Sequence, residues 1–257
     1  MLGRISIFLY GVVCYAVFFA TFVSASGFVG NLWVPKAIDA APTVPLATAL
    51  LTNLGLLGLF AVQHSVMARP AFKRWWTRFV PEAAERSTYV LLSSLALIAL
   101  FAFWQPMGGV VWAVDSPLAR ALIHGVYALG WALILVSTFL INHFDLFGLR
   151  QVWLQLRGVP YSPLRFGTPW LYRYVRHPLY VGWFLAFWAT PDMSITHLVF
   201  ALATSAYILI AIRFEERDLV AAHPEYERYR REVPMLVPRL RRPDAATSGE
   251  GGMESAA

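Results

Sequence analysis

Long apolar segments divide this chain, and their lengths constrain the fold more than any other feature. A helix needs about 20 predominantly apolar residues to cross the hydrocarbon core of a bilayer. Segments of about this length occupy residues 5–29, 46–67, 87–104, 121–141 and 195–214. Segment 179–190 is shorter, so we expect five full spans plus a short helix, or six spans. The predicted fold class is an all-α, polytopic integral membrane helical bundle.

Composition and charge support this class and exclude several others. Hydrophobic residues make up 58% of the chain and charged residues 14%. The net charge of +6 comes from basic residues clustered in particular loops, which indicates the positive-inside pattern rather than nucleic-acid binding. From this pattern we expect a protein of a bacterial plasma membrane with both termini, and any functional site at the basic loops, on the cytoplasmic side. The first segment is too long for a signal-peptide core and is expected to remain as a span.

Several kinds of site are also excluded by residue type. Cys14 is the single cysteine, so an intrachain disulfide and a thiolate metal cage are ruled out. No closely spaced ligand pair of the HxxxH kind occurs, and we expect no metal site. The glycine fingerprint GxGxxG of Rossmann folds is missing, so a cofactor would have to bind at membrane helix ends and loops.

The order of segments predicts three regions. Residues 1–141 form a four-span membrane domain that includes an interfacial amphipathic helix at 69–80, where aromatic residues recur with helical spacing. Residues 142–238 form a long aromatic loop, a helical hairpin and a C-terminal module. Residues 239–257 are rich in Pro, Ala, Ser and Gly and are expected to be a disordered tail. The glycine pairs 27/30 and 55/58 are expected to permit close helix packing.

Charged residues flank the last hairpin at both ends. Arg176 and His177 precede its first limb, and Glu215 and Glu216 follow its second. Because the limbs run antiparallel, the two clusters are predicted to meet at the same membrane face. Arg176 suits a carboxylate, and either glutamate suits an ammonium or hydroxyls, as in an amino-acid-bearing cofactor. The alternative is that these charges are topology signals and a solvated helix end.

The same residues carry a family resemblance. The motif RHPxYxG (Arg176, His177, Pro178, Tyr180, Gly182), followed by Glu215, Glu216, Tyr226 and Tyr229, resembles the C-terminal module of the isoprenylcysteine and phospholipid membrane methyltransferases. Three further stretches (residues 63–69, 142–151 and 163–166) make the chain similar to the methanethiol S-methyltransferases over roughly residues 11–238.

This resemblance implies methylation of methanethiol to dimethyl sulfide with S-adenosyl-L-methionine. It assigns the following residues to the cofactor: Tyr174, Arg176, His177, Pro178, Tyr180, Gly182, Glu215, Glu216 and Tyr229. Pro178 also fits the first turn of a helix, and tyrosines at a membrane interface need no ligand to explain them.

A thiol acceptor reacts mainly as thiolate, so a base near the operating pH is expected. His64 is the first candidate because it lies where its span reaches the interface. His143 with Asp145 is the second, and Gln63, Arg150 and Gln151 are candidates for lining the substrate pocket. The alternatives are a packing histidine at 64, a helix-terminating polar cluster at 143–145, and plain loop charge at 150.

Two other functions remain open at this level. A lipid or isoprenylated carboxylate acceptor predicts a lateral opening between spans, whereas methanethiol predicts a small closed pocket near His64. Parts of the chain also resemble a membrane family linked to nitric-oxide and nitrite metabolism, which implies a non-enzymatic accessory role. The sequence does not determine the oligomeric state.

Overall fold

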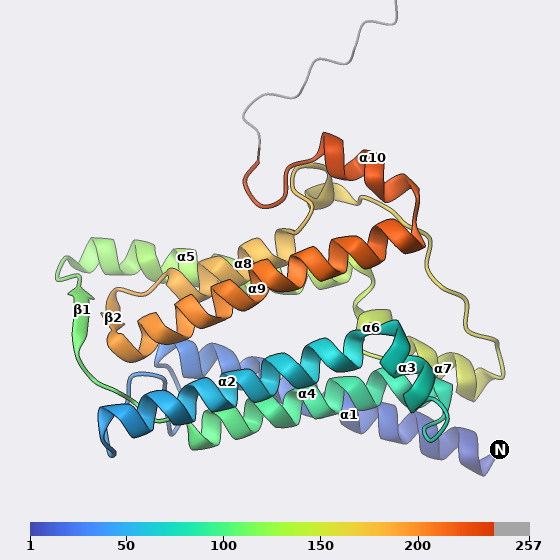
Figure 1. Ribbon diagram of the computed structural model, residues 1–257, viewed down its shortest axis with the longest axis horizontal. Helices are drawn as coiled ribbons and strands as arrows, with labels where there is room; N and C mark the ends of the chain where they lie inside the picture. Colours follow the sequence, from blue (N-terminus) through green and yellow to red (C-terminus); the bar gives the residue numbers. More distant parts are fainter. Residues whose placement is uncertain (239–257) are drawn as a thin grey trace, which may run out of the picture.

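The computed structural model describes residues 1–238 and shows a helical membrane protein (Figure 1). Its helices are α1 (Leu2–Gly30), α2 (Leu46–Ala68), α3 (Pro70–Trp76), α4 (Glu82–Phe103), α5 (Pro117–Ile141), α6 (His143–Leu146), α7 (Leu149–Arg157), η1 (Trp170–Arg173), α8 (Pro178–Trp188), α9 (Ile195–Ala222) and α10 (Glu225–Glu232). Five of them (α1, α2, α4, α5, α9) are long and apolar enough to cross a membrane, and α8 is a shorter apolar helix. The predicted fold class is confirmed, and the predicted tail lies outside the described residues.

The long helices form two layers (Figure 1). α4 packs between α1 and α2 in one layer, and α8 packs against α5 and α9 in the other. Aromatic residues fill the space between the layers: Phe28, Trp104, Tyr127, Trp131 and Phe200 are all buried. The hydroxyl of Tyr127 donates a hydrogen bond to the carbonyl of Ser26, which ties the layers together. We call the end that carries α3, α6, α7 and α10 the charged end, and the opposite end the ribbon end.

Helix α8 has 11 residues, so it rises only about 16 Å and covers part of the length of its neighbours. It lies against α5 at a point where glycines face each other. A Cβ atom added to Gly182 would lie 2.8 Å from the carbonyl oxygen of Gly130, and one added to Gly130 would lie 2.7 Å from the amide nitrogen of Ala186. The missing side chains allow the two backbones to touch.

The two glycine pairs predicted to permit close helix packing, 27/30 and 55/58, differ from each other in the structure. Added Cβ atoms at Gly55 and Gly58 would meet nothing within 4 Å, so the prediction that this pair permits close packing is wrong. Gly30 does mediate packing, because a Cβ there would lie 2.7 Å from the hydroxyl of Tyr127.

A short antiparallel ribbon closes the ribbon end. Strand β1 (Val110–Ala113) pairs with β2 (Asp192–Ser194), which forms the turn between α8 and α9. Arg120 of α5 binds the carboxylate of Asp192 with two hydrogen bonds of 2.8 and 2.6 Å. The ribbon was not expected from the sequence, and it fixes the turn of the hairpin to the segment that leads into α5.

Three boundaries differ from expectation at the charged end. Helix α4 begins at Glu82 rather than Ser87, with Glu82 and Glu85 in its first turn, where negative charge is favoured. Helix α3 ends at Trp76 and continues as a turn through Phe79, and Pro81 disfavours helical backbone at Val80. The loop expected at 142–175 contains helices α6 and α7.

Candidate functional site

The two ends of the hairpin meet in one buried ion cluster. His177 caps α8 and Pro178 is its first residue, while Glu216 lies in the last third of α9. The Nε atom of Arg176 donates to Oε1 of Glu216 at 2.7 Å, and Nε2 of His177 lies 3.0 Å from the same oxygen. The predicted meeting of the basic and acidic clusters at one end of the bundle is confirmed.

The segment around α10 completes this cluster. The Nη1 atom of Arg176 donates to the carbonyl oxygens of Arg230 and Val233 at 2.7 and 2.6 Å. The hydroxyl of Tyr226 donates to Glu216 at 3.4 Å. Burial, together with the neighbouring Glu216, raises the pKa of Tyr226, which therefore stays protonated. The C-terminal module thus covers the cluster and fixes the direction of the guanidinium.

Glu215 has a different partner from Glu216. The hydroxyl of Tyr180 donates to Oε2 of Glu215 at 2.8 Å. Among residues 1–238, the ion pairs at the cluster involve Glu216 and not Glu215. Glu215 is therefore held by the Tyr180 hydroxyl, whereas Glu216 pairs with Arg176 and His177.

The other residues that the resemblance assigns to the cofactor lie in different surroundings. Tyr229 donates to the carbonyl of Tyr172 at 2.5 Å and is buried, whereas Tyr174 is 57% exposed. Gly182 faces α5 rather than the cluster, at the backbone contact with Gly130. The structure thus gives Gly182 a packing role.

His64 lies between α2 and α4. The hydroxyl of Tyr89 lies 2.9 Å from Nε2 and 3.0 Å from Nδ1 of His64, and Oγ of Ser93 lies 3.1 Å from Nδ1. Nε2 of the neighbouring Gln63 donates to the sulfur of Met67 at 3.1 Å, and Oε1 of Gln63 is buried without a partner among the described residues. The ring of His64 is therefore held by two hydroxyl groups.

His143 is 2% exposed, and both of its ring nitrogens have partners. Nε2 lies 2.8 Å from the hydroxyl of Tyr15, and Nδ1 lies 2.8 Å from Oγ1 of Thr138. The ring also stacks on Phe139 with 4.2 Å between ring centroids. Burial lowers the pKa of His143, which favours the neutral ring. These contacts tie α1, α5 and α6 together.

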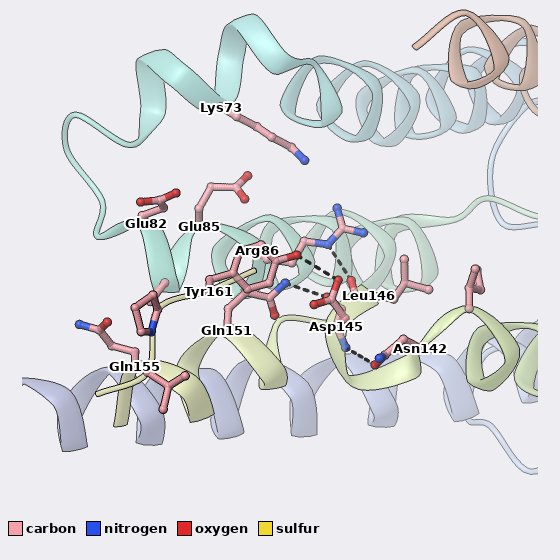
Figure 2. A pocket seen from close by; sticks show the side chains of 14 residues that line it. Lys73, Glu82, Glu85, Arg86, Asn142, Asp145, Leu146, Gln151, Gln155 and Tyr161 are labelled. Carbon is pink, nitrogen blue, oxygen red and sulfur yellow. Dashed lines mark hydrogen bonds between the residues drawn. The ribbon is translucent and has the colours of Figure 1, made fainter. Parts of the chain in front are cut away.

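The remaining expected residues lie at a polar cavity of about 650 Å³ between α3, α4, α6 and α7 (Figure 2). Asp145 and Gln151 line the cavity. Arg150 lies next to the cavity and donates a hydrogen bond to Oδ1 of Asp145 at 2.8 Å. Nε2 of Gln151 donates to the carbonyl of Asp145 at 3.0 Å. Asp145 does not contact either histidine, so it does not orient an imidazole in this arrangement.

Sequence reasoning missed the charged residues on the opposite wall of this cavity. Lys73 comes from α3, and Glu82, Glu85 and Arg86 come from the first turns of α4. For the three α4 residues the sequence signal was the run Glu-Ala-Ala-Glu-Arg, which follows the interfacial helix and precedes the predicted apolar span. Within the described residues, no group of three or more His, Cys, Asp or Glu side chains could hold a metal ion.

Sequence comparisons place the chain among known proteins. It is 58% identical over 238 residues to a methanethiol S-methyltransferase of Crocosphaera subtropica, covering 92% of this chain and 93% of the relative. It is 54% identical over 231 residues to one of Mycobacterium tuberculosis, covering 90% and 95%. Nurim of Sus scrofa is 31% identical over 199 residues, covering 73% and 72%. No family model and no solved structure matches the chain.

Proposed function

Because the chain belongs to the methanethiol S-methyltransferase family, we propose that it methylates methanethiol to dimethyl sulfide with S-adenosyl-L-methionine as the methyl donor. The observation that carries this proposal is the identity of 48–58% to proteins with that name over most of the chain. A methyltransferase role follows from family membership; the donor and the thiol acceptor are the proposed parts.

The ion cluster at the hairpin ends has the chemistry that such a donor needs. One arginine and two glutamates leave a single net negative charge there when His177 is neutral. S-Adenosyl-L-methionine carries a carboxylate, an ammonium and a sulfonium, with one net positive charge. In the proposal Arg176 holds the carboxylate, and Glu215 and Glu216 hold the ammonium or the ribose hydroxyls. Tyr180 positions the carboxylate of Glu215 through its 2.8 Å hydrogen bond.

When bound, the donor would supply a methyl group on a positively charged sulfur; the thiolate would bond to the methyl carbon, and the donor sulfur would leave as a neutral thioether. Even the cysteine thiol has a reference pKa of about 8.5, so a simple thiol is almost entirely protonated at neutral pH. His64 is the proposed base that accepts the thiol proton, and Tyr89 and Ser93 hold its ring. In the proposal Gln63 lines the part of the site that holds methanethiol, and its Oε1 atom is buried without a partner among the described residues. His143 and Asp145 support the surrounding helices in this proposal, in keeping with their contacts.

Basic residues determine the proposed orientation. The ribbon end has Lys36 and Arg120. The segments at the charged end (α3 and the turn after it, α7, and the chain before α8) carry Lys73, Arg74, Arg78, Arg150, Arg157, Arg165 and Arg173. This asymmetry favours a bacterial plasma membrane with the charged end in the cytoplasm, where the methyl donor is available.

Purified protein in detergent, given methanethiol and S-adenosyl-L-methionine, should release dimethyl sulfide into the headspace, measured by gas chromatography. Glu216→Gln should weaken donor binding about ten- to hundredfold, because it removes a charged hydrogen-bond acceptor. Glu232→Gln is the matched control, since Glu232 forms an exposed ion pair with Arg228 on α10. It should leave the donor Kd unchanged.

Two results would contradict the proposal in different ways. Wild-type protein that binds donor but methylates an added prenyl or acyl substrate and not methanethiol would transfer the function to a lipid acceptor. Donor affinity that is the same in Glu216→Gln and wild type would remove the hairpin cluster from donor binding.

A further inference from the structure

The polar cavity at the charged end contains a buried carboxylate without a partner. Glu85 is 9% exposed, and its Oε1 atom is buried with no hydrogen-bond partner among the described residues. Oε1 of Gln151, on the opposite wall, is also buried and unpartnered. Unsatisfied buried acceptors are costly, so two of them on side chains that line one cavity favour a bound donor group there.

Cationic groups face the same space. Figure 2 shows the ammonium of Lys73 pointing into the cavity from α3, above the carboxylate of Glu85 and the guanidinium of Arg86. Arg86 uses its Nε atom to donate to the carbonyl of Leu146 at 2.7 Å and rests on the ring of Tyr89. Burial lowers the pKa of Lys73, and Arg86 adds to this effect. A negatively charged group between these two side chains would offset both contributions.

The charges of the cavity balance in pairs. The two positive charges of Lys73 and Arg86 equal the two negative charges of Glu82 and Glu85. Asp145 forms an ion pair with Arg150 at 2.8 Å. A simple anion would meet the two glutamates, and a simple cation would meet the lysine and the arginine. A ligand with one positive and one negative group separated by a short distance satisfies both sets.

We propose that this cavity binds an α-amino acid group, whose ammonium contacts Glu85 and Gln151 and whose carboxylate lies between Lys73 and Arg86. The volume of about 650 Å³ is in the usual range for small-molecule sites. The group can belong to a free amino acid or to the end of a larger molecule such as the methyl donor or its demethylated product.

The site is distinct from the donor site of the proposed function. None of Arg176, His177, Glu215 and Glu216 lines the cavity. The ligand class is argued from the charges of the cavity and does not depend on the methyl acceptor.

Isothermal titration calorimetry of the full chain in detergent micelles tests the inference with two probes, L-methionine and S-adenosylhomocysteine. We expect at least one probe to bind wild-type protein. Glu85→Gln and Lys73→Met should weaken that binding about ten- to hundredfold, since each removes one charge-assisted contact. Arg74→Gln is the matched control, because Arg74 adjoins Lys73 on α3 but is exposed and does not line the cavity. Thermal unfolding confirms that each variant is folded.

Each possible result supports the proposed amino-acid site or contradicts it. Methionine binding that Glu85→Gln weakens and Glu216→Gln leaves unchanged supports a separate amino-acid site. S-Adenosylhomocysteine binding that Glu85→Gln weakens and Glu216→Gln leaves unchanged also supports an amino-acid group as the ligand. That result would place the methyl donor in this cavity and would overturn only the assignment of the donor to the hairpin cluster. Binding of neither probe, equal affinity in Glu85→Gln and wild type, or equal affinity for methioninamide, which lacks the carboxylate, overturns the inference.

Discussion

The contact between α5 and α8 makes a strong quantitative prediction at Gly182. An alanine Cβ there would lie 2.8 Å from the carbonyl oxygen of Gly130, 2.8 Å from Cγ1 of Ile134 and 2.9 Å from the amide nitrogen of Ile134. Two of these atoms belong to the backbone and cannot rotate away, so the helices must separate. Overpacking of this kind costs about 1–3 kcal/mol. For a chain of this size, about 2 kcal/mol lowers Tm by roughly 4–8 °C.

The assay is thermal unfolding of purified protein in one detergent, followed by circular dichroism. Gly125→Ala is the matched control, because Gly125 lies on α5, the partner helix that carries Gly130, and an added Cβ there meets nothing within 4 Å. Its Tm should stay the same or rise slightly. Gly130→Ala should lower Tm like Gly182→Ala, and the double variant should lose less than the two losses combined, because both alanines press on one contact.

An unchanged Tm in Gly182→Ala would refute the packing argument. If donor affinity fell at the same time, Gly182 would belong to the binding site, as the family resemblance implies.

Three further predictions concern buried polar groups. His64→Ala should lower kcat at neutral pH and recover partly at high pH, where thiolate forms unaided, and the same loss at every pH would exclude it as the base. The pKa of His143 is lowered in the fold, so the neutral ring contributes stability above about pH 6.5, and this contribution is lost as the pH falls. The decrease in Tm between pH 7 and pH 5 should therefore be smaller in His143→Gln than in wild type. An equal decrease would show that other groups cause it. The side chain of Asn53 forms hydrogen bonds with the backbone carbonyl and the backbone amide of Gln105 at 2.7 and 2.8 Å. Asn53→Ala should therefore lower the free energy of unfolding, measured by chemical denaturation, by about 2–4 kcal/mol. A decrease under about 1 kcal/mol would show that water replaces the side chain.

Much of the architecture could be predicted because membrane spans leave a direct sequence signal. Segment length and apolar content located the long helices and the short limb α8. The antiparallel hairpin was then sufficient to bring Arg176 and Glu216 together, although they are 40 positions apart. This inference depended on chain direction alone and not on side-chain packing.

The missed features have physical reasons. The β1–β2 ribbon joins segments about 80 residues apart, and neither is long enough to show alternation. Helix α7 was predicted as part of the long loop, although Gly148 and Gly158 flank it with φ of 87° and 71° and supply the left-handed caps. The cavity combines residues from α3, α4, α6 and α7, so its charges gather only after the helices pack.

The ribbon also determines which wall of the hairpin cluster can move. Helix α8 is joined to α5 along its body by the glycine contact and at its far end through β2 and Asp192. It therefore behaves as a fixed part of α5, and His177 at its start is a stationary reference point. If the cluster binds the proposed donor, we expect any closing movement to come from α10 and the end of α9, which reach the cluster from the other side.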